Sequence, residues 1–386
     1  MAAPIRLSSR VPADEPNDLT LARDDARRRG VALTELTDSN PTRHGLMDPG
    51  VMQAVGRHLA EAAEYVPDPR GWPPARAALA QRFGGHPDDY WLTSSTSEAY
   101  SWLFTALADP GDAVAVPVPG YPLVEPLARL ASLRTVAYPA VYLHPHGWEL
   151  DLASVDAAVD QARVVVAVNP NNPTGAYLAR DQAARLGASC ETAGVPLIAD
   201  EVFFPFTLDH DAAPGRLADA AGPDTVVLTL DGLSKLLAAP QLKLSWIRLS
   251  GPSELTSPIA DALDTVGDAF LSVNSPVACA LPELLGMADA TVDRITSRCR
   301  TNLAALGGLG DGFRVRRTQG GWTALLDVPR TADDGDLARR LLDAGLAVHP
   351  GWFYDLSSQA CLAVSLLPEP AAFARAIDRL RAAITG

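Results

Sequence analysis

Three residues with functional side chains each follow a separate apolar segment of the chain. Asn172 comes after RVVVAV, Asp200 ends the apolar part of VPLIADEVF, and Lys235 comes shortly after TVVLTLDG. Apolar runs of this kind are typical of buried parallel strands, whose carboxyl ends meet at one edge of a sheet. Ligands bind at that edge, so the sequence predicts that an amide, a carboxylate and a lysine converge there.

These residue types suit the chemistry of pyridoxal 5'-phosphate (PLP). The aldehyde of this cofactor requires an amine, so Lys235 is the predicted Schiff-base residue and the base that moves the substrate proton. A buried Asp200 would keep the ring nitrogen protonated by raising its pKa, and Asn172 would donate to the phenolic oxygen O3′. A strand-end cap for Asp200 and a simple turn for NPTG are the alternatives, and the three residues in this order argue against both.

Lysine is rare in this chain. Lysines and arginines together number 32, and only Lys235 and Lys243 are lysines. Arginine can replace lysine at the surface, but it stays protonated and cannot form an imine, whereas a desolvated lysine can. Both lysines are therefore candidates for a site, and the alternative is that they are leftover surface residues.

Two further segments suit the phosphate and the ring of the same cofactor. In TSSTSEAY, the hydroxyl residues Ser95, Thr96 and Ser97 stand at the expected start of a helix, where free backbone N–H groups attract anions. An ordinary helix N-cap is the alternative, and both roles can hold together. In PGYP, Tyr121 is a candidate to stack on the pyridine ring, or else a core tyrosine.

The other patterns describe the scaffold that must position these residues. Apolar runs alternate with helical segments, which indicates an α/β fold with a mostly parallel central sheet sandwiched by helices. We expect a smaller α+β domain after it, and the predicted division is 1–45 (packing with the small domain), 46–275 (PLP-binding) and 276–386. The clearest expected elements are helices at 18–30, 97–108, 123–131, 334–344 and from 370, and strands at 163–168, 195–199, 225–232 and 244–250.

The motifs in their order resemble the class I/II aminotransferases of PLP fold type I, such as aspartate aminotransferase, over nearly the whole chain. The motifs that carry the resemblance are SNPT with HG, Tyr65 with RGWPPAR, TSSTSEAY, PGYP, NPNNPTG, ADEVF, GLSK, GGW and VHPGWFY. The resemblance implies the roles given above for Lys235, Asp200 and Asn172, and it adds Ser234 as a phosphate ligand. It also implies that Tyr65 reaches the phosphate of a neighbouring subunit, which would make the protein a homodimer with shared active sites.

The sequence departs from the family pattern at three positions. Phe203 stands where the family has a tyrosine that donates to O3′, so we expect a raised pKa for the imine. Lys243 replaces a phosphate-binding arginine, which keeps the charge but loses the bidentate fork and leaves Lys243 as an alternative imine lysine. Ala363, in CLAVSLL, stands where the family has the arginine that clamps the substrate carboxylate.

The loss of that arginine leaves substrate binding open. Arg43 and His44, in the N-terminal loop, are candidate replacements, and Trp322 is one if the substrate is apolar. An exposed loop pair is the alternative for Arg43 and His44. The leading hypothesis is an aminotransferase that moves an amino group from an amino acid donor to an oxo-acid or other carbonyl acceptor. The alternatives are elimination, decarboxylation or oxidation on the same scaffold, and a PLP-binding regulator without catalysis.

Composition limits the possible partners, metal sites and cellular location of the protein. The formal net charge of −14 argues against nucleic acid and anionic membrane as partners, because both require a basic face. The four cysteines have no CxxC spacing, so neither a metal site nor a disulfide framework is expected. No run of about 18 apolar residues and no signal-peptide pattern occurs, and we expect a cytoplasmic protein.

Overall fold

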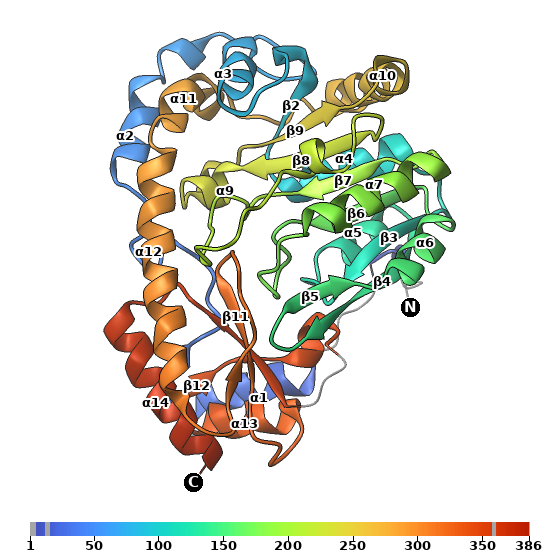
Figure 1. Ribbon diagram of the computed structural model, residues 1–386. Coiled ribbons are helices and arrows are strands. Elements are labelled where there is room, and N and C mark those ends of the chain that lie inside the picture. The colour runs from blue at the N-terminus through green and yellow to red at the C-terminus, as the bar shows by residue number, and fades with distance from the viewer. Residues whose placement is uncertain (1–4, 12–15, 357–359, 386) are drawn as a thin grey trace.

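The computed structural model describes residues 5–11, 16–356 and 360–385, and an eight-stranded sheet lies at its centre (Figure 1). The strand order is β2-β9-β8-β7-β6-β3-β4-β5. Strands β8, β7, β6, β3 and β4 are parallel to one another, whereas β5 pairs antiparallel with β4, β9 with β8, and β2 with β9. The predicted α/β fold with a mostly parallel sheet is therefore confirmed. The strands are β2 (Tyr90–Thr93), β3 (Ala113–Val118), β4 (Arg134–Leu143), β5 (Gly147–Leu150), β6 (Val164–Val168), β7 (Leu197–Asp200), β8 (Val227–Gly232) and β9 (Ser245–Ser250).

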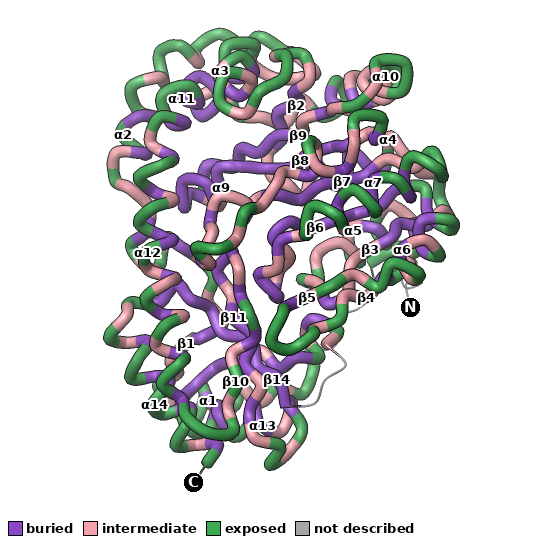
Figure 2. The backbone as a smooth tube through the Cα atoms, viewed as in Figure 1, coloured by how far each residue is buried: buried purple, intermediate pink, exposed green. Residues whose placement is uncertain are grey.

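The central strands are apolar because helices cover both faces of the sheet. Successive side chains of β6 alternate between the two faces: Val164 and Val166 pack with α4 and α5, whereas Val165 and Ala167 pack with α6 and α7. Every residue of β8 is buried, and Figure 2 shows the middle strands as a buried band. The covering helices are α4 (Thr96–Leu107), α5 (Val124–Leu130), α6 (Leu152–Val159), α7 (Arg180–Ala193), α8 (Leu217–Ala220) and α10 (Ser253–Phe270).

A second core forms around a four-stranded sheet of order β10-β11-β14-β13. The N-terminal helix α1 (Asp18–Arg28) joins this part, and β1 (Thr34–Glu35) pairs with β12 (Leu346–Ala347). The other elements here are β10 (Arg314–Val315), β11 (Thr323–Asp327), α13 (Asp334–Asp343), β13 (His349–Pro350), η5 (Gly351–Tyr354), β14 (Cys361–Ser365) and α14 (Pro370–Thr385).

Two consecutive helices connect the two sheets. Helix α11 (Ser275–Leu285) packs against α2 (Gly50–Arg57) and α3 (Pro73–Phe83) beside the large sheet. Helix α12 (Ala288–Leu306) then runs down to the smaller sheet, as Figure 1 shows. The division into 1–45, 46–275 and 276–386 remains a prediction, and its second boundary falls at the start of α11. Across the described ranges, no helix combines the length and the apolar character that a membrane span requires.

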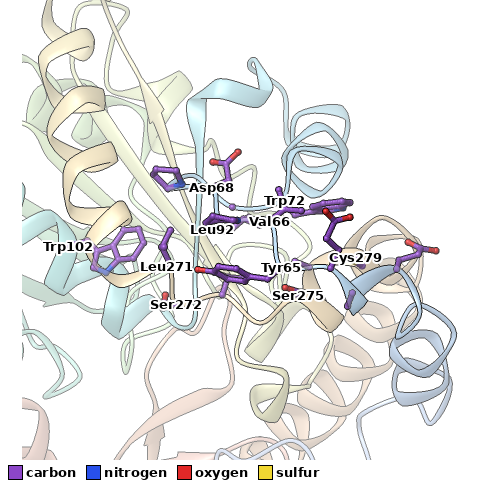
Figure 3. Close-up of a pocket in the computed structure, with 18 residues that line it drawn as sticks. Tyr65, Val66, Asp68, Trp72, Leu92, Trp102, Leu271, Ser272, Ser275 and Cys279 are labelled. Atoms are coloured by element: carbon purple, nitrogen blue, oxygen red, sulfur yellow. The ribbon is translucent and has the colours of Figure 1, made fainter.

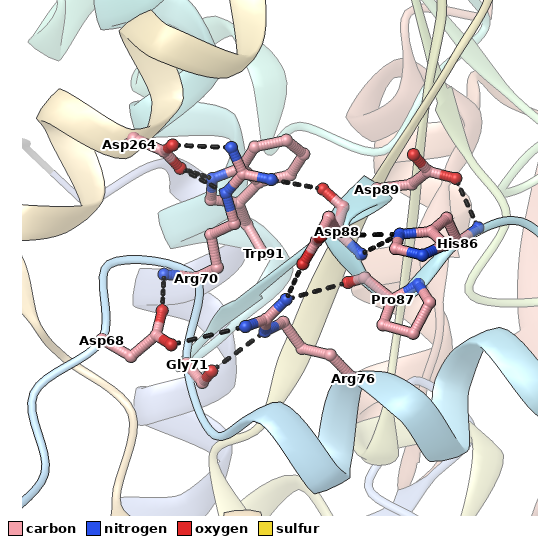
Figure 4. Close-up of polar contacts among 10 residues, drawn as sticks. All are labelled: Asp68, Arg70, Gly71, Arg76, His86, Pro87, Asp88, Asp89, Trp91 and Asp264. Atoms are coloured by element: carbon pink, nitrogen blue, oxygen red, sulfur yellow. Dashed lines mark hydrogen bonds and ion pairs between the residues drawn. The ribbon is translucent and has the colours of Figure 1, made fainter.

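The RGWPPAR segment connects the start of α3 to β2 and α10 through hydrogen bonds of its two arginines (Figure 4). The Arg70 guanidinium donates to both carboxylate oxygens of Asp264 in α10 at 2.6 Å. The indole of Trp91 donates to the same carboxylate at 2.8 Å and lies 4.6 Å under the guanidinium. The buried Arg76 donates to Asp88 at 2.8 Å. Bidentate pairing fixes the entry to α3 relative to β2 and α10.

Candidate active site

A cavity of about 690 Å³ opens at the carboxyl ends of the large sheet, between this sheet and the smaller one. The structure brings most of the predicted site residues together in its lining: Ser95, Thr96, Ser97, Tyr121, Asn172, Asp200, Phe203, Ser234, Lys235, Lys243 and Trp322. Asn172 follows β6, Asp200 ends β7 and Lys235 follows β8, as expected for an open parallel sheet.

Lys235 lies in the short helix α9 (Leu233–Leu236), directly after β8. Gly232 precedes this turn, and a Cβ at that position would lie 2.2 Å from the hydroxyl oxygen of Ser245, so the strand pair requires glycine here. The Lys235 Nζ lies 5.2 Å from the ring centre of Phe203 and 5.0 Å from that of Trp322. Burial of the amine lowers the pKa of Lys235 to about 8, and the charge of Asp200 opposes this shift.

Asp200 ends β7 and is buried. Its carboxylate accepts a hydrogen bond of 3.0 Å from the hydroxyl of Tyr100 and one of 3.3 Å from the backbone N–H of Val202. Burial raises the pKa of Asp200, while these hydrogen bonds and the charge of Lys235 oppose that rise. Tyr100 was not singled out from the sequence, although it lies one helical turn after Thr96 in the same TSSTSEAY segment.

The NPNNPTG loop is held by its other residues and leaves Asn172 available. The Asn171 amide donates to the carbonyl of Pro119 at 3.1 Å, and its Oδ1 accepts from the Thr174 hydroxyl at 2.9 Å. The Oδ1 of Asn172 is buried and has no hydrogen-bond partner among the residues that the structure describes. An amide oxygen accepts hydrogen bonds, and a half-turn of the side-chain amide would present its NH2 group at this position instead, so the site can serve a ligand that donates or one that accepts.

The N-terminus of α4 also opens on the cavity. Ser95 is its N-cap, and its hydroxyl accepts from the Glu98 backbone N–H at 3.2 Å. The first N–H groups of a helix have no intrahelical acceptor, so those beside Thr96 and Ser97 can bind an anion. Lys243 lines the same cavity with an exposed side chain and a left-handed backbone (φ 51°). This end of the cavity combines backbone donors, hydroxyl groups and one cation.

Three predicted residues lie outside the lining of this cavity. Tyr65 is 71% exposed and lines a separate pocket of about 50 Å³ beside α11 (Figure 3). The Arg43 side chain is 72% exposed and lies 3.5 Å from the carboxylate of Asp38. The His44 ring contacts the backbone oxygen of Asp38 at 3.2 Å.

The wall formed by β13 and β14 is neutral. Ala363 is buried in it and pairs in register with His349 on the neighbouring strand. The His349 ring stacks on Phe353 at 4.4 Å, and its Nδ1 lies 2.9 Å from the hydroxyl of Tyr354. Burial and the charge of Arg23 lower the pKa of His349 to about 4, so the imidazole is uncharged at neutral pH. Sequence reasoning did not identify His349 or Tyr354, although both belong to the VHPGWFY motif.

The geometry of this cavity fits PLP. It offers an amine of lowered pKa, a buried carboxylate, an amide without a partner and a helix N-terminus. A family model described as aminotransferase class I and II matches residues 37–380. The chain therefore belongs to the class I and II aminotransferase family, and it is a PLP-dependent aminotransferase of fold type I.

Named proteins show the same similarity. The chain is 28% identical over 311 residues to the alanine aminotransferase of Mycobacterium tuberculosis, covering 78% of this chain and 68% of that protein. It is 28% identical over 265 residues to the glutamate-pyruvate aminotransferase AlaA of Escherichia coli, covering 67% of this chain and 64% of that protein. A Thermus thermophilus aspartate aminotransferase double mutant superposes with a TM-score of 0.83 at 26% identity over 98% of this chain and 100% of that one. An alanine aminotransferase from Pyrococcus furiosus shares the fold, with a TM-score of 0.87 at 22% identity over 98% of this chain and 99% of that one.

Proposed function

We propose that this aminotransferase holds PLP as a Schiff base on Lys235 and exchanges the amino group of an amino acid with a 2-oxo acid. The observation that carries the proposal is the meeting of Lys235, Asp200 and Asn172 in one cavity. They come from the ends of three different strands, which simple turn-capping roles do not explain.

When bound, PLP supplies an aldehyde that reacts with amines and a ring that withdraws electrons from the substrate Cα. Lys235 would serve as the base that takes the proton from the substrate Cα and delivers it to C4′ of the cofactor. A base with a pKa of about 8 is well matched to proton transfer near neutral pH. The rings of Phe203 and Trp322 lie 5.2 Å and 5.0 Å from this amine and form part of its apolar surroundings.

Asp200 is proposed to face the ring nitrogen and Asn172 the phenolic oxygen O3′. The Tyr100 hydroxyl supports Asp200 by donating to its carboxylate, which favours the charged form that the ring nitrogen requires. Tyr121 is half exposed at the cavity and is proposed to cover the ring. Phe203 has no hydroxyl to donate to O3′, so the raised imine pKa expected from the sequence stays part of the proposal.

The phosphate is proposed to bind at the start of α4. Ser95, Thr96 and Ser97 provide donors there, and Ser234 and Lys243 line the same cavity. Lys243 contributes charge without the planar fork of an arginine, so we expect weaker geometric control of the phosphate than an arginine would give.

Tyr65 supports the proposal of a homodimer. A large aromatic side chain that is 71% exposed and lies away from the cavity of its own chain suits a role in the active site of a second copy. Mixing Tyr65→Phe and Lys235→Ala chains tests this arrangement. Sharing predicts that the hybrid contains one site with both wild-type residues and regains activity that neither parent has.

The test of function uses the holoenzyme and single amino acids, with alanine and glutamate first because the named relatives act on alanine or on glutamate and pyruvate. Transamination predicts loss of the yellow colour, one equivalent of 2-oxo acid and recovery of the colour on adding a second 2-oxo acid. Lys235→Ala should bind PLP without this cycle. Release of carbon dioxide, ammonia or peroxide without an oxo-acid-dependent return would instead identify the alternative chemistry.

A further inference from the structure

An amino acid or 2-oxo acid carries a carboxylate, and the wall at Ala363 offers it no cation. Among the described residues that line the main cavity, the cationic side chains are Lys235 and Lys243. Lys235 is assigned to the cofactor and Lys243 to its phosphate. His349, directly across from Ala363, is uncharged at neutral pH. A carboxylate left beside this wall would be desolvated without a partner, which is costly.

A second, open pocket of about 450 Å³ adjoins the main cavity and shares part of its lining. The shared residues are Thr37, Ser39, Lys235 and Pro240. The N-terminal segment contributes three arginines to this second pocket: Arg23, Arg27 and Arg43. A group attached to a substrate near Lys235 can therefore enter a region that contains guanidinium groups.

Two of these arginines are already paired. Arg27 donates to the Oε1 of Glu35 at 3.0 Å and also lies 3.8 Å from Asp24. Arg43 lies 3.5 Å from the carboxylate of Asp38, and its side chain is 72% exposed. The side chains of Arg27 and Arg43 are 49% and 72% exposed, against 38% for Arg23, so burial separates Arg23 from Arg43 but hardly from Arg27. What distinguishes Arg27 is its close carboxylate partner.

Arg23 differs from both. Its Nε is buried and has no hydrogen-bond partner within the described part of the chain. Within the described ranges, its ion pair is a long contact of 3.7 Å to the same Glu35 oxygen that Arg27 holds at 3.0 Å. Because an arginine presents five donors in a planar fork, Arg23 retains capacity for a bidentate acceptor.

The fold also holds Arg23 near the wall that lacks the arginine. Helix α1 precedes β1, where Glu35 pairs in register with Ala347, two residues before His349. The carbonyl of Leu36 accepts from the backbone N–H of Ser365, at the end of β14, at 2.6 Å. The charge of Arg23 contributes to the lowered pKa of His349, so the guanidinium and the imidazole interact.

We propose that Arg23, from the N-terminal helix, binds the substrate carboxylate and replaces the family arginine that is absent at Ala363. The inference rests on the proposed function, because it assigns the carboxylate of that substrate. It makes the substrate class α-amino acids and 2-oxo acids whose carboxylate points toward the N-terminal segment. Arg23 is then a specificity-determining residue that touches substrate.

The test measures binding to the holoenzyme of two unreactive ligands of one shape, 3-phenylpropionate and its neutral amide, by calorimetry. The variants are Arg23→Gln and Arg23→Lys, with Arg27→Gln as the matched control from the same helix and pocket. We expect Arg23→Gln to weaken the binding of 3-phenylpropionate at least about 10-fold and the binding of the amide less than about 2-fold. The affinity of Arg23→Lys for 3-phenylpropionate should lie between those of the wild type and Arg23→Gln. Arg27→Gln should change the affinity for either ligand less than about 3-fold.

The inference is overturned if Arg23→Gln binds 3-phenylpropionate as the wild type does, or if it loses both ligands equally. It is also overturned if the wild type does not prefer the carboxylate to the amide. In transamination, the corresponding expectation is a KM for the amino acid raised at least about 10-fold with kcat changed little. Because ligand binding requires no turnover, a failure of the proposed transamination leaves this measurement readable.

Discussion

The lowered pKa of Lys235 gives a prediction for the cofactor-free protein. At pH 7, a pKa of about 8 leaves about 9% of the amine neutral. An ordinary lysine with a pKa of about 10.4 would have about 0.04% neutral, so burial raises the reactive fraction about 200-fold. When the pH is changed from 6 to 10, acylation of Lys235 should rise with a midpoint near pH 8 and level off above about pH 9.

Because the chain has only two lysines, the assay has an internal reference. Short pulses of acetic anhydride, followed by digestion and mass spectrometry, report the labelling of Lys235 and of the exposed Lys243 in the same sample. The charge of Asp200 raises the pKa of Lys235 against the effect of burial. Asp200→Asn should therefore move the midpoint for Lys235 below that of the wild type and increase its labelling at pH 7.

Two results would contradict the expected pH dependence of Lys235 acylation. A rate for Lys235 that keeps rising to pH 10 would mean that the rings of Phe203 and Trp322 do not desolvate the amine. A midpoint that moves upward in Asp200→Asn would mean that the carboxylate does not stabilise the ammonium. Labelling of Lys243 should be insensitive to Asp200→Asn, and an equal change there would indicate a general loss of structure.

Three further changes have defined expectations. Phe203→Tyr adds a hydrogen-bond donor beside Lys235 and should lower the imine pKa by about 1 unit in a pH titration of the absorption spectrum. An unchanged imine pKa would show that residue 203 does not control it. Tyr100→Phe removes the hydrogen bond to Asp200 and should weaken PLP binding about 5- to 10-fold in equilibrium dialysis, with unchanged affinity as the contrary result. Gly187→Ala would place a Cβ 1.8 Å from the backbone oxygen of Ala221 and should lower the free energy of unfolding by more than about 2 kcal/mol. Gly56→Ala, where a Cβ meets open space, should leave it unchanged or raise it by up to about 1 kcal/mol. Denaturant titrations measure both changes.

Elements with a strong local pattern were predictable from the sequence. The strands expected at 163–168 and 225–232 correspond to β6 and β8, and the helix expected from residue 370 is α14. Other elements were not anticipated, including β4, β5 and α10. The alternation in β4 is irregular because only Tyr138 of its ten residues is fully buried, so the strand is defined mainly by its pairing with β3 and β5.

The candidate site divides in the same way. Lys235, Asp200 and Asn172 were found because each follows a recognisable apolar strand, and the carboxyl ends of parallel strands must meet. Tyr100 and His349 were not found because a side chain on a helix or in a motif carries no mark of the group that it contacts. Their roles depend on the hydrogen bond to Asp200 and on the register with the strand that contains Ala363.

The fold class, the family resemblance and the three residues at the strand ends could be predicted from the sequence, because hydrophobic periodicity is local and the motifs occur in a recognisable order. The sequence also determined that an arginine is absent at Ala363. Which arginine lies near that wall depends on the fold, because the pairing of β1 with β12 brings together segments that are hundreds of positions apart. The same reason applies to the pKa of Lys235, which packing around the amine sets and no local sequence pattern encodes.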